Sequence, residues 1–172
     1  MKTSLILTTI GPDKPGLVEL LATTLAEHQA NWQQSSMSRL AGQFAGILIA
    51  TADTNRVDSL LAALDKLSEQ GLNVSVITES SASISPAAGT ALTLELVGHD
   101  KPGIVRDISR ALAARGISVE ELTTEVVSGS MSAEQLFKAQ ASLLMPAGAD
   151  IDDLQDALEA IASDLMVDIT LD

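Results

Sequence analysis

Apolar residues along the chain follow two periods, and these alternate in the same order in each half of the sequence. Leu5 and Leu7 near the start, and Leu92 and Leu94 in the second half, are two residues apart, which is typical of a strand with one buried face. Spacings of three and four residues come next and predict an amphipathic helix. These helical positions are Leu17, Leu20, Leu21 and Leu25 in the first half and Ile104, Val105, Ile108 and Leu112 in the second.

An eight-residue segment that follows the expected first strand occurs in both halves. The segment Gly11-Pro12-Asp13-Lys14-Pro15-Gly16-Leu17-Val18 recurs 87 residues later as Gly98-His99-Asp100-Lys101-Pro102-Gly103-Ile104-Val105, with six of the eight residues identical. The apolar positions on either side correspond as well, so we interpret the chain as a duplicated unit. We expect each helix to begin at the proline, because a first-turn residue needs no N–H group.

The rest of each half predicts a hairpin, a second helix and a closing strand. In the first half these are strands over 31–38 and 44–52, a helix over 54–70 that Gly71 ends, and a strand over 74–78. In the second half they are strands over 118–127 and 135–145, a helix over 150–164 and a strand over 167–171. The connection inside the second hairpin is the longer of the two.

Each half therefore predicts the order βαββαβ, and the fold class is α+β. That order in a short unit implies a ferredoxin-like sandwich, in which both helices cover one face of a four-stranded antiparallel sheet. We expect two tandem units over residues 1–79 and 90–172. The segment 80–89 is rich in serine and alanine, lacks apolar periodicity and predicts a linker.

Composition removes several classes of protein. Hydrophobic residues make up 46% of the chain, which excludes a disordered protein, and no apolar run reaches the ~18 residues of a membrane span. The absence of cysteine removes disulfides, thiolate metal sites and cysteine nucleophiles, and the cytoplasm is the expected compartment. A formal net charge of −13 opposes direct binding to nucleic acid.

The duplicated loop has the parts of a site for a carboxylate. Glycines let the backbone approach a ligand, and the start of the following helix presents free N–H groups and the positive end of its dipole. The same residues would also suit a tight strand-to-helix turn without a ligand, in which Asp13 or Asp100 caps the helix. Both interpretations remain open at this point.

A βαββαβ unit whose first strand leads through Gly-x-Asp-Lys-Pro-Gly into a helix resembles the ACT domain, a small-molecule regulatory module of amino-acid metabolism. The resemblance implies that a small amino acid binds beside the loop and that Asn31, after the first helix, contacts it; the matching position in the second half is Ser118. We expect the first site to be the stronger, because of Asn31 and because Pro12 stiffens its loop where the second has His99. The expected ligand contacts are Gly11, Pro12, Asp13, Lys14, Pro15, Gly16, Leu17 and Asn31, and Gly98, His99, Asp100, Lys101, Pro102, Gly103, Ile104 and Ser118.

Two such units without a catalytic or DNA-binding domain resemble the glycine cleavage system transcriptional repressor family. The resemblance implies a non-enzymatic protein without a cofactor, which binds a LysR-type transcriptional activator and releases it when glycine binds. Open sheet edges favour packing of the two units against each other and a homodimer. Two alternatives remain: an adaptor without a ligand, and a regulatory part of an amino-acid-metabolism enzyme.

Other residues with possible chemistry have simpler explanations. His28 and His99 lack the partners of a metal site or a catalytic triad, and Trp32, Phe44 and Phe137 are expected in the core. A group of acidic residues at and near the start of the last helix stabilises that helix through its dipole, and such side chains are ordinarily solvated. It could alternatively dock a basic partner. The group is Asp150, Asp152, Asp153, Asp156 and Glu159.

Overall fold

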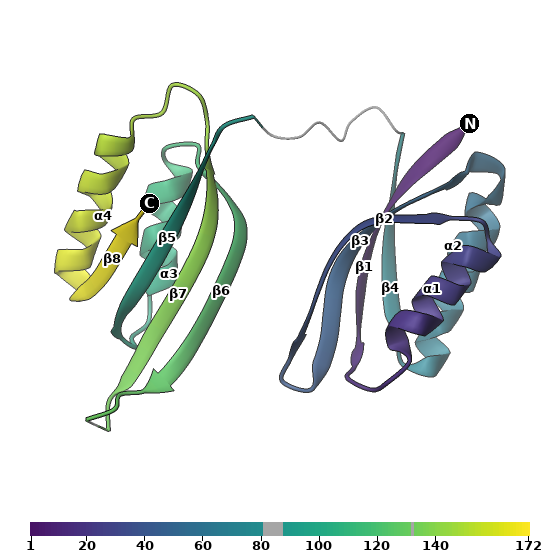
Figure 1. Ribbon diagram of the computed structural model, residues 1–172, viewed down its shortest axis with the longest axis horizontal. Helices are drawn as coiled ribbons and strands as arrows, with labels where there is room; N and C mark the ends of the chain where they lie inside the picture. The colour runs from purple at the N-terminus through teal and green to yellow at the C-terminus, as the bar shows by residue number, and fades with distance from the viewer. Residues whose placement is uncertain (81–87, 132) are drawn as a thin grey trace. The chain divides into compact units, whose positions relative to one another are not determined.

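The computed structural model describes residues 1–80, 88–131 and 133–172. The chain divides into two compact units, Met1–Ser85 (unit 1) and Pro86–Asp172 (unit 2) (Figure 1). The predicted linker over 80–89 lies largely outside the described residues. No described helix is long and apolar enough to cross a membrane.

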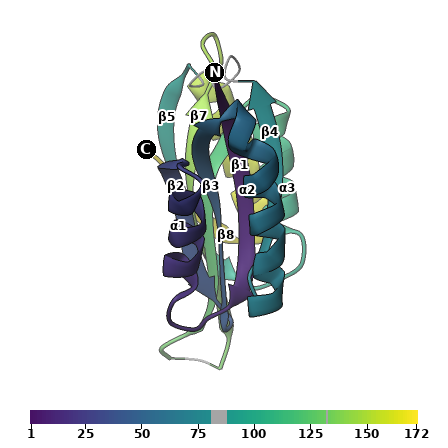
Figure 2. The same ribbon diagram turned by 90° about the vertical axis from the view of Figure 1, so that its right-hand side faces the viewer.

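Unit 1 is a four-stranded antiparallel sheet covered on one face by its helices (Figure 2). The strand order is β2-β3-β1-β4, so the first strand is central. The elements are β1 (Lys2–Pro12), α1 (Leu17–Glu27), β2 (Asn31–Leu40), β3 (Gln43–Asp53), α2 (Val57–Asp65) and β4 (Asn73–Ser80). Two 3₁₀ turns, η1 (Thr54–Arg56) and η2 (Lys66–Gln70), extend α2 at its two ends.

Unit 2 repeats this arrangement with the strand order β6-β7-β5-β8. Its elements are β5 (Thr90–His99), α3 (Ile104–Ala113), β6 (Ser118–Ser128), β7 (Gln135–Met145), α4 (Ile151–Leu165) and β8 (Val167–Leu171). Both units show a register shift at the same place, between Trp32 and Gln34 in one and between Val119 and Glu121 in the other. The predicted βαββαβ order and ferredoxin-like sandwich are confirmed for both units.

Each unit has its own hydrophobic core between the sheet and the helices. In unit 1, Leu5 and Leu7 of β1 pack with leucines of both helices, and Leu60 is fully buried. In unit 2, Leu154 of α4 holds a matching central position and is also fully buried. The three aromatic residues, Trp32, Phe44 and Phe137, are partly buried against these cores.

The first helix of each unit starts later than the sequence predicts. Helices α1 and α3 begin at Leu17 and Ile104, two residues after Pro15 and Pro102, so the predicted start at the proline is wrong. The physical reason is the glycine in between: Gly16 has φ 94° and Gly103 has φ 96°. A left-handed residue cannot belong to a right-handed helix, so each glycine is the residue before the first turn.

We expect a core substitution to destabilise one unit at a time, because the cores are separate. Leu60→Ala should lower the free energy of unfolding of unit 1 by about 2–5 kcal/mol. Hydrogen exchange measured by mass spectrometry should then show faster exchange in unit 1 only. Leu154→Ala is the reciprocal control, and an equal loss of protection in both units from either variant would contradict independent cores.

Candidate functional site

Near the end of β1, just before the loop that leads to α1, stands a glycine that the packing requires. A Cβ on Gly11 would lie 2.8 Å from the carbonyl oxygen of Gly71, at the turn that follows η2. In unit 2 a Cβ on Gly98 would collide with the side chain of Val167. The end of the central strand therefore lies against the turn before β4 in unit 1 and against the first residue of β8 in unit 2, and only glycine allows that approach.

The aspartate of the loop ties it to the adjacent hairpin. The Asp13 N–H donates to the carbonyl of Gly42 at 2.9 Å, and the Arg39 guanidinium donates to the Asp13 carboxylate at 3.1 Å. Asp13 is three residues before Gly16, which stands at the cap position, so the interpretation of Asp13 as a helix cap is wrong. This aspartate fixes the loop to the sheet instead.

The second loop is attached to its hairpin in the same way. The Asp100 N–H donates to the carbonyl of Gln135 at 3.0 Å, and the His99 ring nitrogen Nδ1 lies 3.3 Å from the Glu134 carboxylate. The cap position of α3 is Gly103, so Asp100 is not a cap either.

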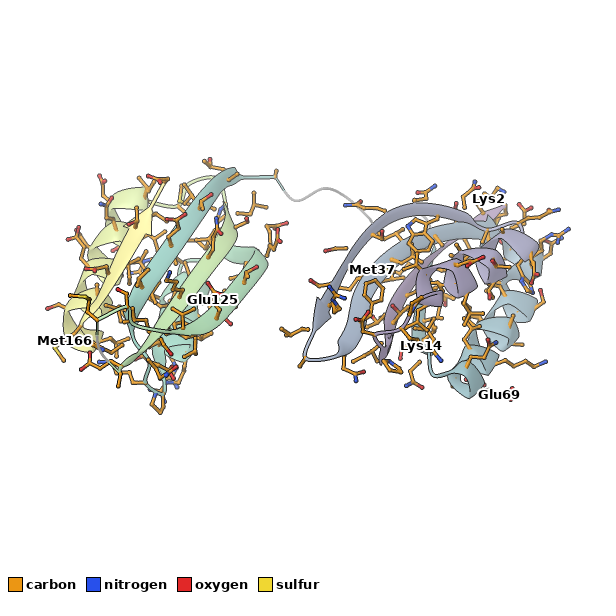
Figure 3. All side chains as sticks on the ribbon, turned by 60° about the horizontal axis from the view of Figure 1, so that its bottom comes forward. Lys2, Lys14, Met37, Glu69, Glu125 and Met166 are labelled. Atoms are coloured by element: carbon orange, nitrogen blue, oxygen red, sulfur yellow. The ribbon has the colours of Figure 1, made fainter. Side chains whose placement is uncertain are left out.

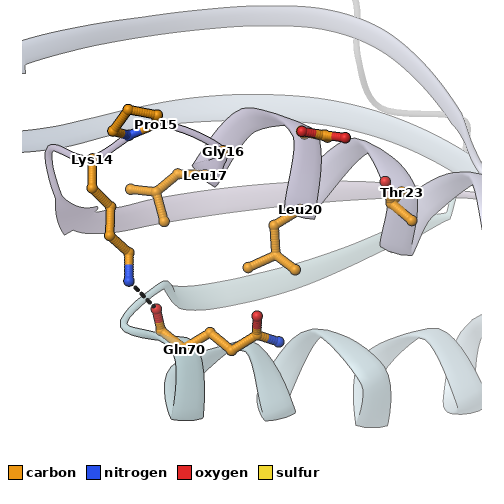
Figure 4. A pocket seen from close by; sticks show the side chains of 8 residues that line it. Lys14, Pro15, Gly16, Leu17, Leu20, Thr23 and Gln70 are labelled. Atoms are coloured by element: carbon orange, nitrogen blue, oxygen red, sulfur yellow. Dashed lines mark hydrogen bonds between the residues drawn. The ribbon is translucent and has the colours of Figure 1, made fainter.

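Beside the first loop lies an open hollow of about 460 Å³ (Figure 4). Lys14, which is labelled in Figure 3, borders it and reaches η2, where its ammonium donates to the carbonyl of Gln70 at 3.1 Å (Figure 4). Glu19, in the first turn of α1, and the apolar Leu20 line the same hollow. The full lining is Lys14, Pro15, Gly16, Leu17, Glu19, Leu20, Thr23 and Gln70.

The hollow offers complementary charges for a small zwitterion. The first-turn N–H groups of α1 have no acceptor within the helix, and Gly16 has no side chain that could cap them. These groups and the Lys14 ammonium suit a carboxylate. The Glu19 carboxylate and the carbonyl of Gln70 suit an ammonium group. An α-amino acid carries both groups.

The corresponding loop of unit 2 carries a charge of the opposite sign at the position of Glu19. Arg106 occupies the position of Glu19, because both stand three residues after the left-handed glycine. Its guanidinium nitrogen Nη2 lies 2.9 Å from where a Cβ on Gly103 would be, and its Nε donates to Asp107 at 3.1 Å. The second loop therefore carries a cation over its glycine, and the carboxylate in its first helix turn, Asp107, is paired with that cation.

Asn31 is not near the loop of its own unit. It opens β2 opposite Thr51, which pairs with Ser4, whereas Gly11 lies seven residues further along β1, opposite Phe44. At ~3.3 Å per residue this separates them by roughly 23 Å. Ser118 likewise stands at the far end of its sheet, opposite Leu144. The ligand roles expected for Asn31 and Ser118 stay predictions, but neither residue can complete the loop of its own unit.

The other predicted loop residues divide into core and surface. The side chains of Leu17 and Ile104 are buried in the two cores and hold the first helix turns in place. Pro12 and Pro15 are exposed, as are Lys14 and Gly16, while Lys101 is half-buried. The residues that sequence reasoning missed are Glu19, Leu20, Thr23 and Gln70. Aligning the repeats one turn further would have shown the contrast between Glu19 and Arg106.

Two of the five acidic residues near α4 have partners in the fold. Asp150 caps the helix by accepting a hydrogen bond from the Asp152 N–H at 2.9 Å, and Asp153 accepts one from Arg115 at 2.8 Å. No group of three or more potential metal ligands occurs among the residues the structure describes.

Comparison with known families gives the same description for both units. Residues 3–76 match one family model of the ACT domain, and residues 92–165 match a second model, also described as an ACT domain. The two matches together span most of the chain.

Similarity to individual proteins extends over the full length. The chain is 20% identical over 162 residues to the glycine cleavage system transcriptional repressor of Escherichia coli (strain K12), covering 94% of this chain and 85% of that protein. A solved structure of an unknown protein from Galdieria sulphuraria has a TM-score of 0.81 at 26% identity, with 100% and 98% of the two chains covered. A candidate glycine cleavage system transcriptional repressor has a TM-score of 0.76 at 17% identity, with 100% and 97% covered.

Alanine at the left-handed position before α1 should destabilise unit 1 through backbone strain alone. Gly16 has φ 94° and open space around its Cβ position, so Gly16→Ala should cost about 1–2 kcal/mol of unfolding free energy without a clash. Gly16→Asn is the control, since asparagine tolerates this region better. Denaturant titration should rank the stabilities wild type, Gly16→Asn, Gly16→Ala; equal stability of all three would contradict the strained turn.

Proposed function

Since the chain belongs to the ACT-domain family, with one domain in each half, we propose that it is a non-enzymatic repressor of the glycine cleavage system that responds to glycine. In this proposal it acts by binding a LysR-type activator protein and not by binding DNA. The full-length relationship to the repressor of Escherichia coli supports the choice of system. The observation that supports a small amino acid as the signal is the hollow beside the first loop.

The chemistry of that hollow favours a small ligand. Lys14 and the first turn of α1 supply donors for a carboxylate, and Glu19 supplies the opposite charge for an ammonium group. Leu20 adds a short apolar surface to the lining of the same hollow. Glycine has both charged groups and no side chain to place, so it fits an open hollow that offers few further contacts.

The partner is proposed to be a protein because the charge of the chain opposes nucleic acid. The formal net charge is −13, with 10 basic residues in total, and a phosphate backbone would be repelled. The exposed acidic side chains of α4, Asp152 and Asp156 among them, suit a basic patch on an activator.

Regulation requires that the two binding events oppose each other. If glycine binds the partner-free state more tightly, the partner must lower the affinity for glycine by the same factor. Lys14 bridges the first loop and η2, so a ligand carboxylate that engages the Lys14 ammonium changes the link between these two segments. We propose that this link is what glycine alters.

Calorimetric titration of the full chain with glycine should show binding that depends on Lys14 and Glu19. Lys14→Met and Glu19→Gln should each weaken the affinity about tenfold or more, because each removes a charge-assisted contact. Glu19→Arg, which installs the residue found in unit 2, should abolish binding. The matched control is Lys101→Met in unit 2, which should leave the affinity unchanged.

Two results would contradict this site. Wild-type protein that takes up no glycine at millimolar concentration would favour the adaptor interpretation. Unchanged affinity in Lys14→Met and Glu19→Arg, with folding intact by circular dichroism, would move the ligand away from the first loop. A reporter of the glycine cleavage operon can be measured with and without glycine in cells that carry each variant. This measurement would test whether the response of repression to glycine depends on the same residues.

A further inference from the structure

The face of the unit 1 sheet that its helices leave uncovered is apolar. Antiparallel register places Ile49 and Ile77 on either side of Ile6, in one row across β3, β1 and β4. Ile47 lies beside this row on β3, and Ile10 lies further along β1. Ile10, Ile47 and Ile77 are 47%, 55% and 61% exposed. We call Ile6, Ile10, Ile47, Ile49 and Ile77 the isoleucine face.

The ferredoxin-like fold does not require this apolar face, because unit 2 has the same sheet without it. The two registers align Gly11 and Phe44 with Gly98 and Phe137. Counting from these pairs, the equivalents of Ile6, Ile47 and Ile49 are Thr93, Gln140 and Ser142. The uncovered face of unit 2 also carries Glu95, Glu125 and Lys138, which line one shallow hollow. Its sheet folds with a polar outer face.

Large exposed apolar patches on soluble domains mark interaction surfaces. We propose that two copies of this chain associate through the isoleucine face of unit 1, sheet against sheet. The inference is independent of the ligand, because none of these five residues lines the hollow beside the first loop.

The net charge of the chain limits contact between two copies to an uncharged surface such as this face. Each chain carries a formal net charge of −13, so two copies repel each other over most of their surfaces. The five isoleucines include no ionisable side chain, and Thr8 and Ser75 lie between them. Ser36 lies beside Ile47 on β2, and Glu79 lies at one end of the face, opposite Ser4. The uncovered face of unit 2 is a poorer match, because its Glu95 and Glu125 carboxylates would lose water against isoleucine.

The whole uncovered face of the unit 1 sheet, which contains the isoleucine face and its polar neighbours, is large enough for a stable dimer. Its four strands of about ten residues measure roughly 33 by 19 Å, on the order of 600 Å², from standard strand dimensions. Two copies would bury roughly 1,200 Å², above the ~1,000 Å² expected of a specific interface. Sheets packed in this way stand ~10 Å apart, and the β-branched side chains would interdigitate between them.

The first experiment exchanges the face for the residues of unit 2. Wild-type protein at ~100 μM should have twice the monomer mass of 17.9 kDa by light scattering after size exclusion. The triple variant Ile6→Thr, Ile47→Gln, Ile49→Ser should elute as a monomer, and Ile10→Thr should weaken the dimer. The matched control for Ile10→Thr is Val97→Thr, since Val97 holds the equivalent position in unit 2, is 40% exposed and lies outside the proposed interface.

The second experiment detects the contact directly and does not depend on disrupting it. It therefore tests the proposal even if the triple variant does not fold. Thr8 lies on β1 opposite Ile47, in the middle of the face, and the chain has no native cysteine. Thr8→Cys should form a covalent dimer with bis-maleimidoethane, a thiol cross-linker whose spacer suits sheets ~10 Å apart, because a central residue meets its own copy across a two-fold axis. Glu95→Cys, at the equivalent position in unit 2, should remain monomeric on a non-reducing gel.

Three outcomes would overturn the proposal. The wild-type chain could be a monomer at 100 μM; the triple variant could fold and stay dimeric; or Glu95→Cys could cross-link as efficiently as Thr8→Cys. The last result would place the contact on unit 2.

Discussion

The close approach of the end of the central strand to the start of the neighbouring edge strand is the constraint on which each unit depends. Gly11 has the carbonyl of Gly71 where a Cβ would be, and Gly98 has the side chain of Val167 there. Because the strand ends against its neighbour, the chain must turn within a few residues to reach the helix face of the sheet. Gly16 and Gly103 make that turn with a positive φ, and the helices then begin with Leu17 and Ile104 already buried in the cores.

The same constraint leaves the start of the helix open to a ligand. A glycine at the cap position satisfies none of the first-turn N–H groups, and the loop aspartate is held by the hairpin instead. The two units then diverge in charge one turn into the helix: Glu19 gives the first hollow both charges, whereas Arg106 lies over the second glycine. The outer sheet faces diverge too, with isoleucine in unit 1 and polar residues in unit 2. One duplicated fold thus carries two different sets of surfaces.

Periodicity and the repeat predicted the order of elements and the fold, because a buried face must recur at period two in strands and near 3.6 in helices. They did not predict where the first helices begin, since the positive φ of Gly16 follows from packing around it and not from its neighbours in sequence. Asn31 was assigned to the loop by resemblance, and only the strand register shows the separation of the two. The apolar outer face was hidden for a related reason: in β1, core leucines alternate with outward isoleucines, so the strand is apolar on both sides.

The central claim is that one of two equivalent loops has become an amino-acid site through its charges. A titration of the ¹⁵N-labelled full chain with glycine, followed by amide chemical shifts, tests it most directly. The account predicts saturable shifts at the amides of residues 14–20 and 70, with residues 101–107 unmoved. Shifts confined to residues 101–107, or no saturable shift in either loop, would contradict it.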